Sequence, residues 1–324
     1  MRGAASLVRA LATGIVAWLA IQSLLFCLVQ SAPGGPVGAL AGDFATAETQ
    51  AAVVRSFDLD QPVLLRYRAF VVRMTQGDWG QSYKFRRSVG ELIAERLAPT
   101  LVLMLSALLV AAAAGSALGL WAATLKHGAA ASAAAAAAAF ALPVFWIGQL
   151  LVLGLGFELR WFPLSGLSDP RGADAGWRAW LDVGWHAVLP VATLALQQAA
   201  FFAIVVLAKA RLELSLGYVR ALRARGIAEH AIVWGHVGRN VLPQIVIAMF
   251  NRVGMLFTGA VLVETLFAWP GLGRLLGSAI LNRDHPVLLG VFALVTAAVI
   301  VSNGLADLLH ARLDPRIGHD RELR

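Results

Sequence analysis

The chain has 324 residues, of which 59% are hydrophobic and 14% are charged. Soluble domains carry about 45–50% apolar and about 25% charged residues, so this composition excludes an ordinary soluble protein and predicts an integral membrane protein. The apolar residues come in long runs that suit spanning helices, so we expect an all-helical fold. The formal net charge is +8; an excess of basic residues in the inside loops explains it, and no basic stripe interleaved with aromatic residues suggests a nucleic-acid partner.

The first apolar segment runs from Leu7 to Gln30 and follows Arg2 and Arg9. A cleaved signal peptide also begins with basic residues, but its apolar core has about 7–15 residues. This apolar run is longer, and a helix that crosses a bilayer core of about 30 Å needs about 20 apolar residues. We therefore favour an uncleaved transmembrane anchor over residues 1–30.

Residues 31–96 have a different composition. They open with Pro33, Gly34, Gly35 and Pro36 and then mix basic and acidic side chains. The apolar residues between Thr46 and Met74 have helical spacing, with an interruption at Pro62. We predict a small, mostly helical insertion on the outside face.

Five more apolar runs are long enough to span a membrane, which gives six predicted spans in all. The third span begins with an alanine tract, Ala133–Ala139, and small side chains of this kind let two helices approach closely. The four tryptophans of the loop at Glu158–His186 are typical of a membrane interface. The five runs are approximately Pro99–Leu125, Ala131–Phe157, Ala187–Ala208, Val241–Phe267 and Pro286–Leu309.

The loop between the fourth and fifth spans sets the predicted orientation. It runs from about Lys209 to Arg239 and has six basic residues against two acidic ones. The positive-inside rule places this loop in the cytoplasm. The turn at Lys126 and both termini then lie inside as well, while the loops that begin at Ser31 and Glu158 lie outside.

Several polar residues lie inside the predicted spans, where lipid makes them costly and where they tend to face a pathway or another helix. Arg252 and Glu264 are twelve residues apart, about 18 Å on one helix, so they cannot pair directly. Two interpretations of Arg252 stay open. It faces a water-filled route or a neighbouring subunit, or it is a buried arginine with a structural role. For the glutamines we favour hydrogen bonds between helices. The pathway candidates are Gln149, Gln197, Gln198, Asn251, Arg252 and Glu264.

The stretch from Tyr218 to Pro243 is polar, although apolar spans flank it on both sides. Tyr218, Val219, Leu222 and Ile227 can form one apolar face, with arginines on the other face. Gly226 permits the left-handed backbone that ends one helix and lets the next begin, and Pro243 suits the first turn of the fifth span. A short amphipathic helix of this kind fits either lipid headgroups or a groove in a partner protein.

Sequence patterns of catalysis and cofactor binding are missing. Cys27 is the single cysteine, which excludes an intrachain disulfide and a cysteine-based metal site. The sequence contains no P-loop, HExxH or nucleophile-elbow pattern. We expect a non-enzymatic chain without a cofactor or metal of its own, and any ATP-driven work would come from another chain.

Several motifs of the chain resemble those of a known protein family. The run Tyr218–Gly226 (YVRALRARG), followed by His236–Pro243 (HVGRNVLP), resembles the cytoplasmic loop of bacterial ABC importer permeases in the dipeptide and oligopeptide branch. Further runs are similar to signatures of the same family: Gly77–Ser82, Leu142–Gly148, Gly259–Leu276, Ile280–Gly290 and Leu308–Ile317. Two positions depart from the family pattern: Arg-Ala-Leu replaces Glu-Ala-Ala or Arg-Thr-Ala at Arg220–Leu222, and Gly35 stands where aspartate is common.

The resemblance implies a type I importer permease (MetI-like) fold in the bacterial inner membrane, with a periplasmic insertion at 31–96, a five-helix core at 97–317 and a cytoplasmic tail at 318–324. It also implies alternating access driven by two ATP-binding subunits, which use ATP and Mg, with a second homologous permease and a periplasmic binding protein. Peptides are the expected cargo, with nickel complexes or another small solute as alternatives. A secondary transporter or an intramembrane enzyme fits less well, because neither a repeat nor a catalytic pair is visible. The residues implied to couple to the ATPase are Tyr218, Val219, Arg220, Ala221, Leu222, Arg225, Gly226, Arg239 and Pro243.

Overall fold

The computed structural model describes residues 2–31, 60–125, 127–169 and 176–313, together with residues 46, 48, 51, 54 and 55. The described chain is helical, and its one β-like feature is an isolated bridge between Gln81 and Ser88. Gly35, most of residues 31–59, Lys126 and the tail at 318–324 lie outside the described residues, so the predictions made for them stay predictions.

The apolar helices confirm the predicted all-helical membrane protein. Four are long and apolar enough to cross a bilayer: Ala12–Ser31, Val89–Thr124, Trp177–Leu214 and His285–His310. Two bent helix pairs, Ala129–Ala141 with Val144–Glu158 and Ala231–Asn251 with Val253–Leu266, raise the number to six if each pair is one span. The described part of the chain therefore has between four and six candidate spans.

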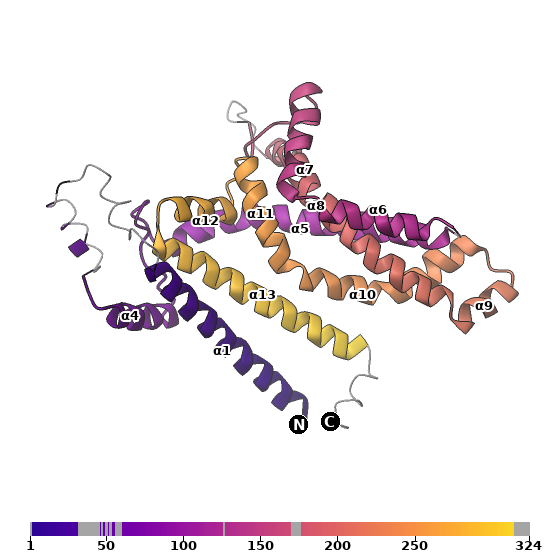
Figure 1. Cartoon of the computed structure of the whole chain (residues 1–324), viewed down its shortest axis with the longest axis horizontal. Coiled ribbons are helices and arrows are strands. Elements are labelled where there is room, and N and C mark those ends of the chain that lie inside the picture. Colours follow the sequence, from indigo (N-terminus) through magenta and orange to yellow (C-terminus); the bar gives the residue numbers. More distant parts are fainter. Residues whose placement is uncertain are drawn as a thin grey trace. The chain divides into compact units, whose positions relative to one another are not determined.

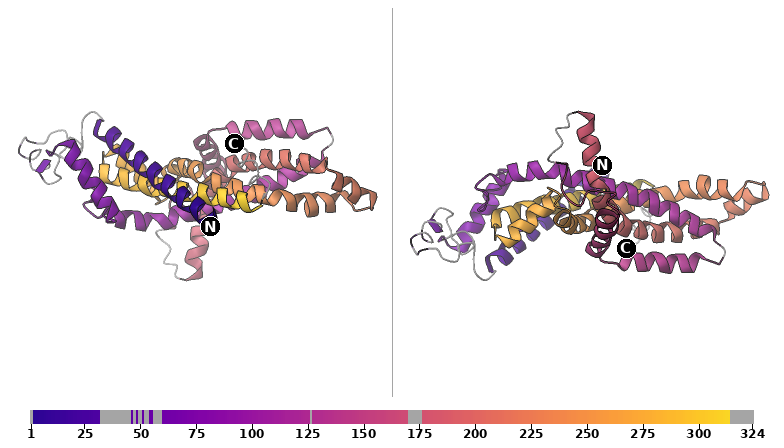
Figure 2. Two further views of the ribbon diagram at one scale, coloured as in Figure 1. Left: turned by 90° about the horizontal axis from the view of Figure 1, so that it is seen from below. Right: turned by 90° about the horizontal axis from the view of Figure 1, so that it is seen from above.

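The chain forms two compact units (Figures 1 and 2). Unit 1 comprises Met1–Thr100 and Pro270–Val301, and unit 2 comprises Leu101–Trp269 and Ser302–Arg324. The boundaries fall within two helices, α5 (Val89–Thr124) and α13 (His285–Leu313), so each of these helices contributes to both units.

Unit 1 pairs the first helix with the start of the last one. In α1 (Arg2–Ser31), Trp18 Nε1 donates a 2.9 Å hydrogen bond to the Ala293 carbonyl of α13. A Cβ added at Gly14 would lie 3.0 Å from Ile300 Cγ2. Residue numbers therefore increase along α1 in the direction in which they decrease along α13. The two helices are antiparallel, and the end of α1 lies at the level where α13 begins.

The insertion contributes one described helix to unit 1, α4 (Val63–Thr75), which packs on α1 through ring contacts of Phe26 with Tyr67 and Phe70. Its start directly after Pro62 confirms the predicted interruption, because proline suits a helix start and lacks the N–H that a helix interior needs. The last residues of the predicted insertion, 89–96, already belong to α5, which continues through Pro99. The predicted boundary at Arg96 stays a prediction.

A buried aspartate joins two motifs of unit 1 that are about 200 residues apart. Asp284 is 1% exposed and accepts hydrogen bonds from the Ser82 hydroxyl and from the backbone N–H groups of Tyr83 (3.1 Å) and Lys84 (3.2 Å). It lies between α12 (Leu272–Leu281) and α13, where the sequence suggests only a loop. A buried carboxylate with several donors fixes the loop that precedes α5.

Unit 2 is organised around α8 (Trp177–Leu214), a helix of 38 residues. At 1.5 Å per residue it is about 57 Å long, so it extends beyond a hydrocarbon core of about 30 Å. The predicted fourth span, Ala187–Ala208, is therefore only the middle of this helix. Gly115 and Gly119 of α5 pack against it so closely that a Cβ at Gly119 would lie 2.7 Å from the Ala203 carbonyl oxygen.

The alanine tract packs against a neighbouring helix, which confirms the predicted packing face. Helix α6 (Ala129–Ala141) lies along α8 in both Figure 1 and Figure 2. Its partly covered positions, Ser132, Ala133, Ala136, Ala139 and Phe140, recur every three or four residues, which is the spacing of one helix face.

The third predicted span is not one straight helix. After α6 the chain bends by 88° into α7 (Val144–Leu151) and a π-helical turn, Val152–Glu158. Leu142 is extended, with φ −67° and ψ 133°, because a residue before proline is pushed out of the helical region. Pro143 therefore ends α6 inside the apolar run.

The fifth predicted span is also broken. A π-helical turn, Ala231–Val237, leads into α10 (Gly238–Asn251), and the chain bends by 55° at Arg252 before α11 (Val253–Leu266). Arg252 and Glu264 are thus not on one continuous helix. Pro243 lies inside α10 rather than at the start of the span, and it removes one backbone hydrogen bond from that helix.

Candidate functional site

The polar stretch folds as predicted into a short helix that ends at a glycine. Helix α9 (Gly217–Ala224) follows the end of α8 after a turn at Ser215 and Leu216. Gly226 has φ +73°, a conformation that glycine adopts without steric cost, and the Ile227 N–H bonds back to the Leu222 carbonyl at 3.2 Å. Gly226 therefore turns the chain from α9 back toward α10.

The apolar face of α9 is held against unit 2. Val219 is fully buried and Leu222 is half-buried, whereas Ala221 on the opposite side is exposed. Burying Val219 contributes about 1.5–3 kcal/mol relative to leaving it exposed, which is enough to orient a helix of only eight residues.

A three-residue hydrogen-bond network fixes α9 to the ends of α8 and α10. Tyr218 Oη donates to Glu213 Oε2 at 2.9 Å, and Asn240 Nδ2 lies 3.2 Å from the same oxygen and 3.1 Å from Tyr218 Oη. Lys209 Nζ adds an ion pair to Glu213 Oε1 at 3.2 Å. Partial burial and the Glu213 carboxylate raise the pKa of Tyr218, so its hydroxyl stays protonated and keeps donating.

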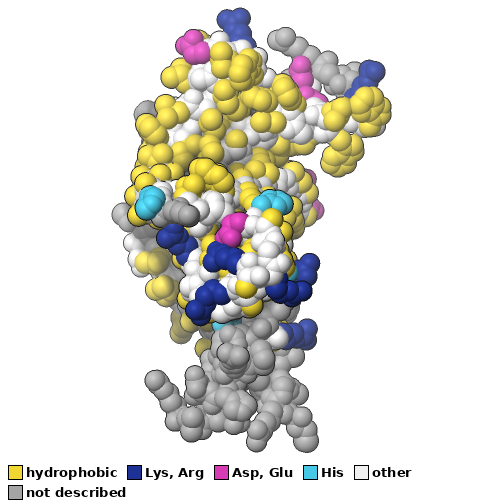
Figure 3. Space-filling view, turned by 90° about the vertical axis from the view of Figure 1, so that its right-hand side faces the viewer, with side chains coloured by type: hydrophobic (Ala, Val, Ile, Leu, Met, Phe, Trp, Pro, Cys, Tyr) yellow, Lys and Arg dark blue, Asp and Glu magenta, His cyan; other side chains and the backbone are white. Residues whose placement is uncertain are grey.

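The outer face of this helix is basic. Arg220, Arg223, Arg225 and Arg239 are all exposed, and Figure 3 shows basic side chains gathered on the end of unit 2 that faces the viewer. Arg223 binds Glu229 through two hydrogen bonds of 2.6 Å and 3.0 Å, and this contact raises the pKa of Arg223. The pair bridges the two sides of the turn at Gly226, while Arg220, Arg225 and Arg239 present further cations to the surface.

Arg211, near the end of α8, anchors the same region. Arg211 Nη2 donates to the Leu125 carbonyl at the end of α5, 2.8 Å away. The end of α8 is thereby attached to α5 as well as to α10 through Glu213. Hydrogen bonds thus connect α9, which carries the basic surface, with α8, with α10 and, through Arg211, with the end of α5. A movement of α9 would therefore be transmitted to these helices of unit 2.

Inside unit 2, three of the six pathway candidates lie together at the two helix breaks. Gln198 of α8 is 3% exposed and accepts a 2.9 Å hydrogen bond from Arg252 Nε. The guanidinium also lies 4.1 Å from the Phe201 ring centre and 5.5 Å from that of Phe140. Gln197 Nε2 lies 3.0 Å from the Leu142 carbonyl oxygen, which the break after α6 leaves without a helical partner.

These contacts confirm the predicted hydrogen bonding between helices for Gln197 and Gln198. They also favour the structural interpretation of Arg252, because a hydrogen bond and two aromatic faces hold its charge. Its Nη2 is buried with no hydrogen-bond partner among the described residues.

The other three candidates differ in exposure. Gln149 on α7 and Asn251 at the end of α10 are exposed, whereas Glu264 on α11 is fully buried. Glu264 therefore does not share the exposed surface of Gln149 and Asn251.

Three functional residues escape sequence reasoning. Glu213 and Asn240 anchor α9, and Asp284 anchors the loop at Ser82, but each reads as an ordinary polar residue next to an apolar run. For Glu213 the available signal is its position: an acid inside a basic loop, four residues after Lys209 and five before Tyr218, which is suitable for helical ion pairing.

Comparison with known proteins places the chain in a family. The family model described as "Binding-protein-dependent transport system inner membrane component" matches residues 115–319. A putative peptide transport system permease protein of Brucella abortus is 30% identical over 98% of this chain and 99% of the relative. Di/tripeptide transport system permease protein DppB of Pseudomonas aeruginosa is 31% identical over 95% of this chain and 96% of its own length.

A third relative has a different printed cargo. Glutathione transport system permease protein GsiC of Salmonella choleraesuis is 33% identical over 92% of this chain and 94% of the relative. The similarity therefore covers nearly the whole length of each pair of chains. This chain belongs to the family of inner-membrane components of binding-protein-dependent transport systems.

Proposed function

We propose that this chain forms half of the translocation pathway of an ATP-driven importer, and that α9 is the element through which partner ATPases move it. The observation that carries the proposal is the anchoring of α9. A short helix with a basic outer face is fastened by Glu213, Tyr218 and Asn240 to the two helices that lead into the apolar part of unit 2.

The partners follow from what this chain lacks. Its sequence has no P-loop, so ATP and Mg belong to two ATP-binding subunits whose grooves receive α9. A second, homologous permease completes the pathway, and a periplasmic binding protein delivers the cargo. We propose that α9 and both termini lie in the cytoplasm of a bacterial cell and that the insertion at 31–96 lies in the periplasm.

Peptides are the proposed cargo. The relatives carry names for peptide, di- and tripeptide, and glutathione transport, and all of these are short peptides or peptide-like molecules. We assign Gln149 and Asn251 to the surface that borders the pathway, because both are exposed on helices next to the breaks. Gln198 and Arg252 hold the break at Arg252 in place instead, and Glu264 is buried within unit 2.

The two helix breaks fit alternating access. Irregular backbone at membrane depth is tolerated where it is buried in protein or lines a water-filled cavity. Here Gln197 supports one break and Gln198, through Arg252, supports the other, and the two glutamines are neighbours on α8. A movement of α8 that starts at α9 would act on both breaks.

A reconstituted transporter tests the coupling role. Liposomes would contain this chain with its partner permease, its ATPases and the binding protein, and both ATP hydrolysis and uptake of trialanine would be measured. Leu222→Asp adds a charge to the half-buried face of α9 and Gly226→Pro breaks the turn, because proline cannot adopt a positive φ. We expect both variants to insert into the membrane while uptake per ATP hydrolysed falls at least about tenfold, within the range that coupling between two sites typically spans.

Leu281→Asp is the matched control, because it makes the same change at a residue that is 84% exposed at the end of α12 in unit 1. It should leave the uptake ratio unchanged. Normal uptake with both α9 variants would rule out α9 as the coupling element, and uptake of trialanine without ATPases would rule out the importer itself.

A further inference from the structure

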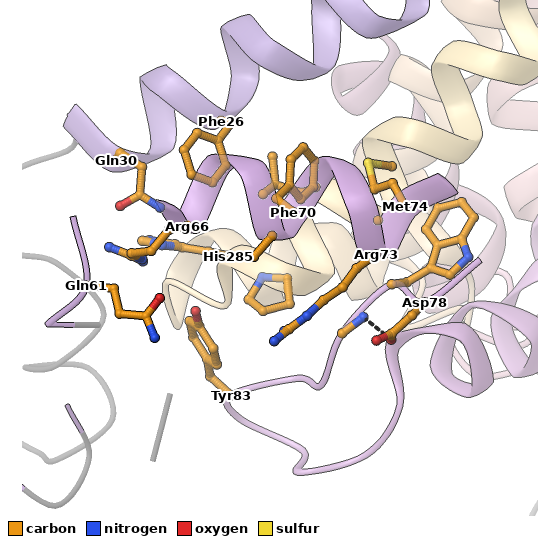
Figure 4. Close-up of a pocket in the computed structure, with 16 residues that line it drawn as sticks. Phe26, Gln30, Gln61, Arg66, Phe70, Arg73, Met74, Asp78, Tyr83 and His285 are labelled. Atoms are coloured by element: carbon orange, nitrogen blue, oxygen red, sulfur yellow. Dashed lines mark hydrogen bonds between the residues drawn. The ribbon is translucent and has the colours of Figure 1, made fainter. Parts of the chain in front are cut away.

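Unit 1 contains a cavity of about 390 Å³ that the proposed transport cycle does not use. Its walls come from the end of α1, the inner face of α4, the loop before α5 and the start of α13, as Figure 4 shows. Ligand sites in proteins usually enclose about 300–1,000 Å³, so the cavity is large enough for a small polar group. The lining residues that matter here are Phe26, Arg66, Phe70, Arg73, Tyr83 and His285.

The chemistry of the cavity suits an anion. Arg66, Phe70 and Arg73 recur at helical spacing of four and three residues, so α4 turns both guanidinium groups toward the cavity. Burial raises the pKa of Tyr83, although the hydrogen bond and charge of Arg66 and the charge of Arg73 oppose this rise. The two arginines thus lie close to a neutral hydroxyl that can donate to a bound oxygen.

The charges of the described lining residues leave one positive charge without a negative partner. Among the described residues that line the cavity, Asp78 is the one acid, and its Oδ1 accepts a 2.9 Å hydrogen bond from the Gly80 N–H. Two arginines against one aspartate leave these described lining residues with an excess of one positive charge. His285 is 6% exposed, and its Nδ1 has no hydrogen-bond partner among the residues that the structure describes, so a buried polar atom at the cavity wall is unsatisfied.

The cavity lies at a membrane boundary. Because α1 and α13 are antiparallel, the last turn of one candidate span and the first turn of another meet there, at Gln30 and His285. Leu24 and Leu28 are exposed on the same turns of α1 that carry Phe26 and Gln30, although they do not line the cavity, and Val63, Leu64 and Leu65 are exposed at the start of α4. An arginine-bearing helix with exposed apolar residues is typical of the headgroup region of a bilayer.

We propose that this cavity binds the phosphodiester of a phospholipid headgroup, with Arg66 and Arg73 on the phosphate oxygens and the acyl chains along the exposed apolar face of α1. Arginine binds phosphate through two parallel hydrogen bonds, and the single excess positive charge matches the single charge of a phosphodiester. The carboxylate of a peptide has the same charge but no acyl chains for this apolar face. A bound lipid would join α1, α4 and α13 at the outer end of the pair.

Native mass spectrometry of the complete, delipidated transporter, titrated with palmitoyl-oleoyl phosphatidylglycerol, tests the proposal. Arg66→Gln/Arg73→Gln should bind this lipid about tenfold more weakly than the wild type, because hydrogen bonds to charged groups are lost. Arg68→Gln/Arg86→Gln removes two exposed arginines of the same region that do not line the cavity, and it should bind like the wild type. Met74→Trp fills the cavity but keeps both arginines, and it should also weaken binding. It therefore tests the cavity independently of any misfolding that removal of the two arginines causes.

Three results would overturn the proposal. The first is equal lipid binding by the wild type, Arg66→Gln/Arg73→Gln and Met74→Trp. The second is displacement of the lipid from the wild type by inorganic phosphate alone, which would make the site a free-phosphate site. The third is binding of trialanine, but not of the lipid, in a manner that depends on Arg66 and Arg73, which would make it a site for peptide carboxylates. The coupling role of α9 stands or falls separately, because the uptake ratio does not depend on this cavity.

Discussion

A close contact between α5 and α8 in unit 2 gives a sharp prediction for Gly119→Ala. A Cβ at this position of α5 would lie 2.7 Å from the Ala203 carbonyl oxygen, 2.8 Å from Val206 Cβ and 3.0 Å from the Leu207 backbone nitrogen. None of these atoms belongs to a flexible side-chain end, so no rotamer change can relieve the contact. The two helices must separate to accommodate one methyl group.

The cost follows from that separation. To restore ordinary contact the helices must part by about 0.7 Å, and gaps of this size forfeit a quarter to a half of the dispersion attraction. For about 40 atom pairs across the contact at about 0.15 kcal/mol each, the loss is about 1.5–3 kcal/mol. Overpacked cores lose a similar amount.

Thermal unfolding in detergent and unfolding in increasing denaturing detergent would measure this loss. Gly184→Ala in α8 is the matched control, because nothing lies within 4 Å of the Cβ it adds. It should be neutral or slightly stabilising, since alanine favours a helix over glycine by about 0.5–1 kcal/mol. Equal stability of Gly119→Ala and Gly184→Ala would show that α5 and α8 do not approach as closely as described.

Three further predictions concern the polar anchors. Asn240→Ala removes donors to Glu213 and Tyr218, so amide hydrogen exchange in α9 should speed up about tenfold for a loss of about 1.5 kcal/mol; unchanged exchange would mean that Val219 alone holds the helix. Gln198→Leu removes the acceptor of Arg252 and should destabilise the protein by about 2–3 kcal/mol, measured by thermal unfolding, whereas Gln198→Glu should not. Asp284→Ala removes the acceptor shared by Ser82, Tyr83 and Lys84, so limited proteolysis should cut residues 78–88 sooner than in Asp78→Ala, and equal cutting would contradict the anchoring role.

The sequence predicts well those features that depend on local chemistry. Long apolar runs become long helices, Pro62 precedes a helix, and Gly226 adopts the left-handed backbone at the end of α9. Each of these outcomes rests on hydrophobicity or backbone sterics within a few residues.

Features that depend on distant partners are not predicted. Hydropathy measures how long an apolar run is but not its direction, so it cannot show the bends at Leu142 and Arg252. The break at Arg252 needs Gln198 as a hydrogen-bond partner from another helix, and Asp284 gains its role only when the fold brings Ser82 to it. Pro143 explains the first bend, since proline displaces the preceding residue from the helix, but Pro190 lies inside the continuous helix α8, so a proline in an apolar run does not by itself predict a break.

The central claim, that α9 contacts an ATP-binding subunit, has a direct test. A photoreactive benzoylphenylalanine in place of Ala221, which is exposed on the outer face of α9, would be illuminated in membranes that contain the complete transporter. We predict a cross-linked product with the mass of this chain plus one ATP-binding subunit, and no such product from the same residue in place of exposed Ser88 in unit 1. Cross-links from position 221 to lipid alone, in membranes where the transporter is assembled and active, would contradict the claim.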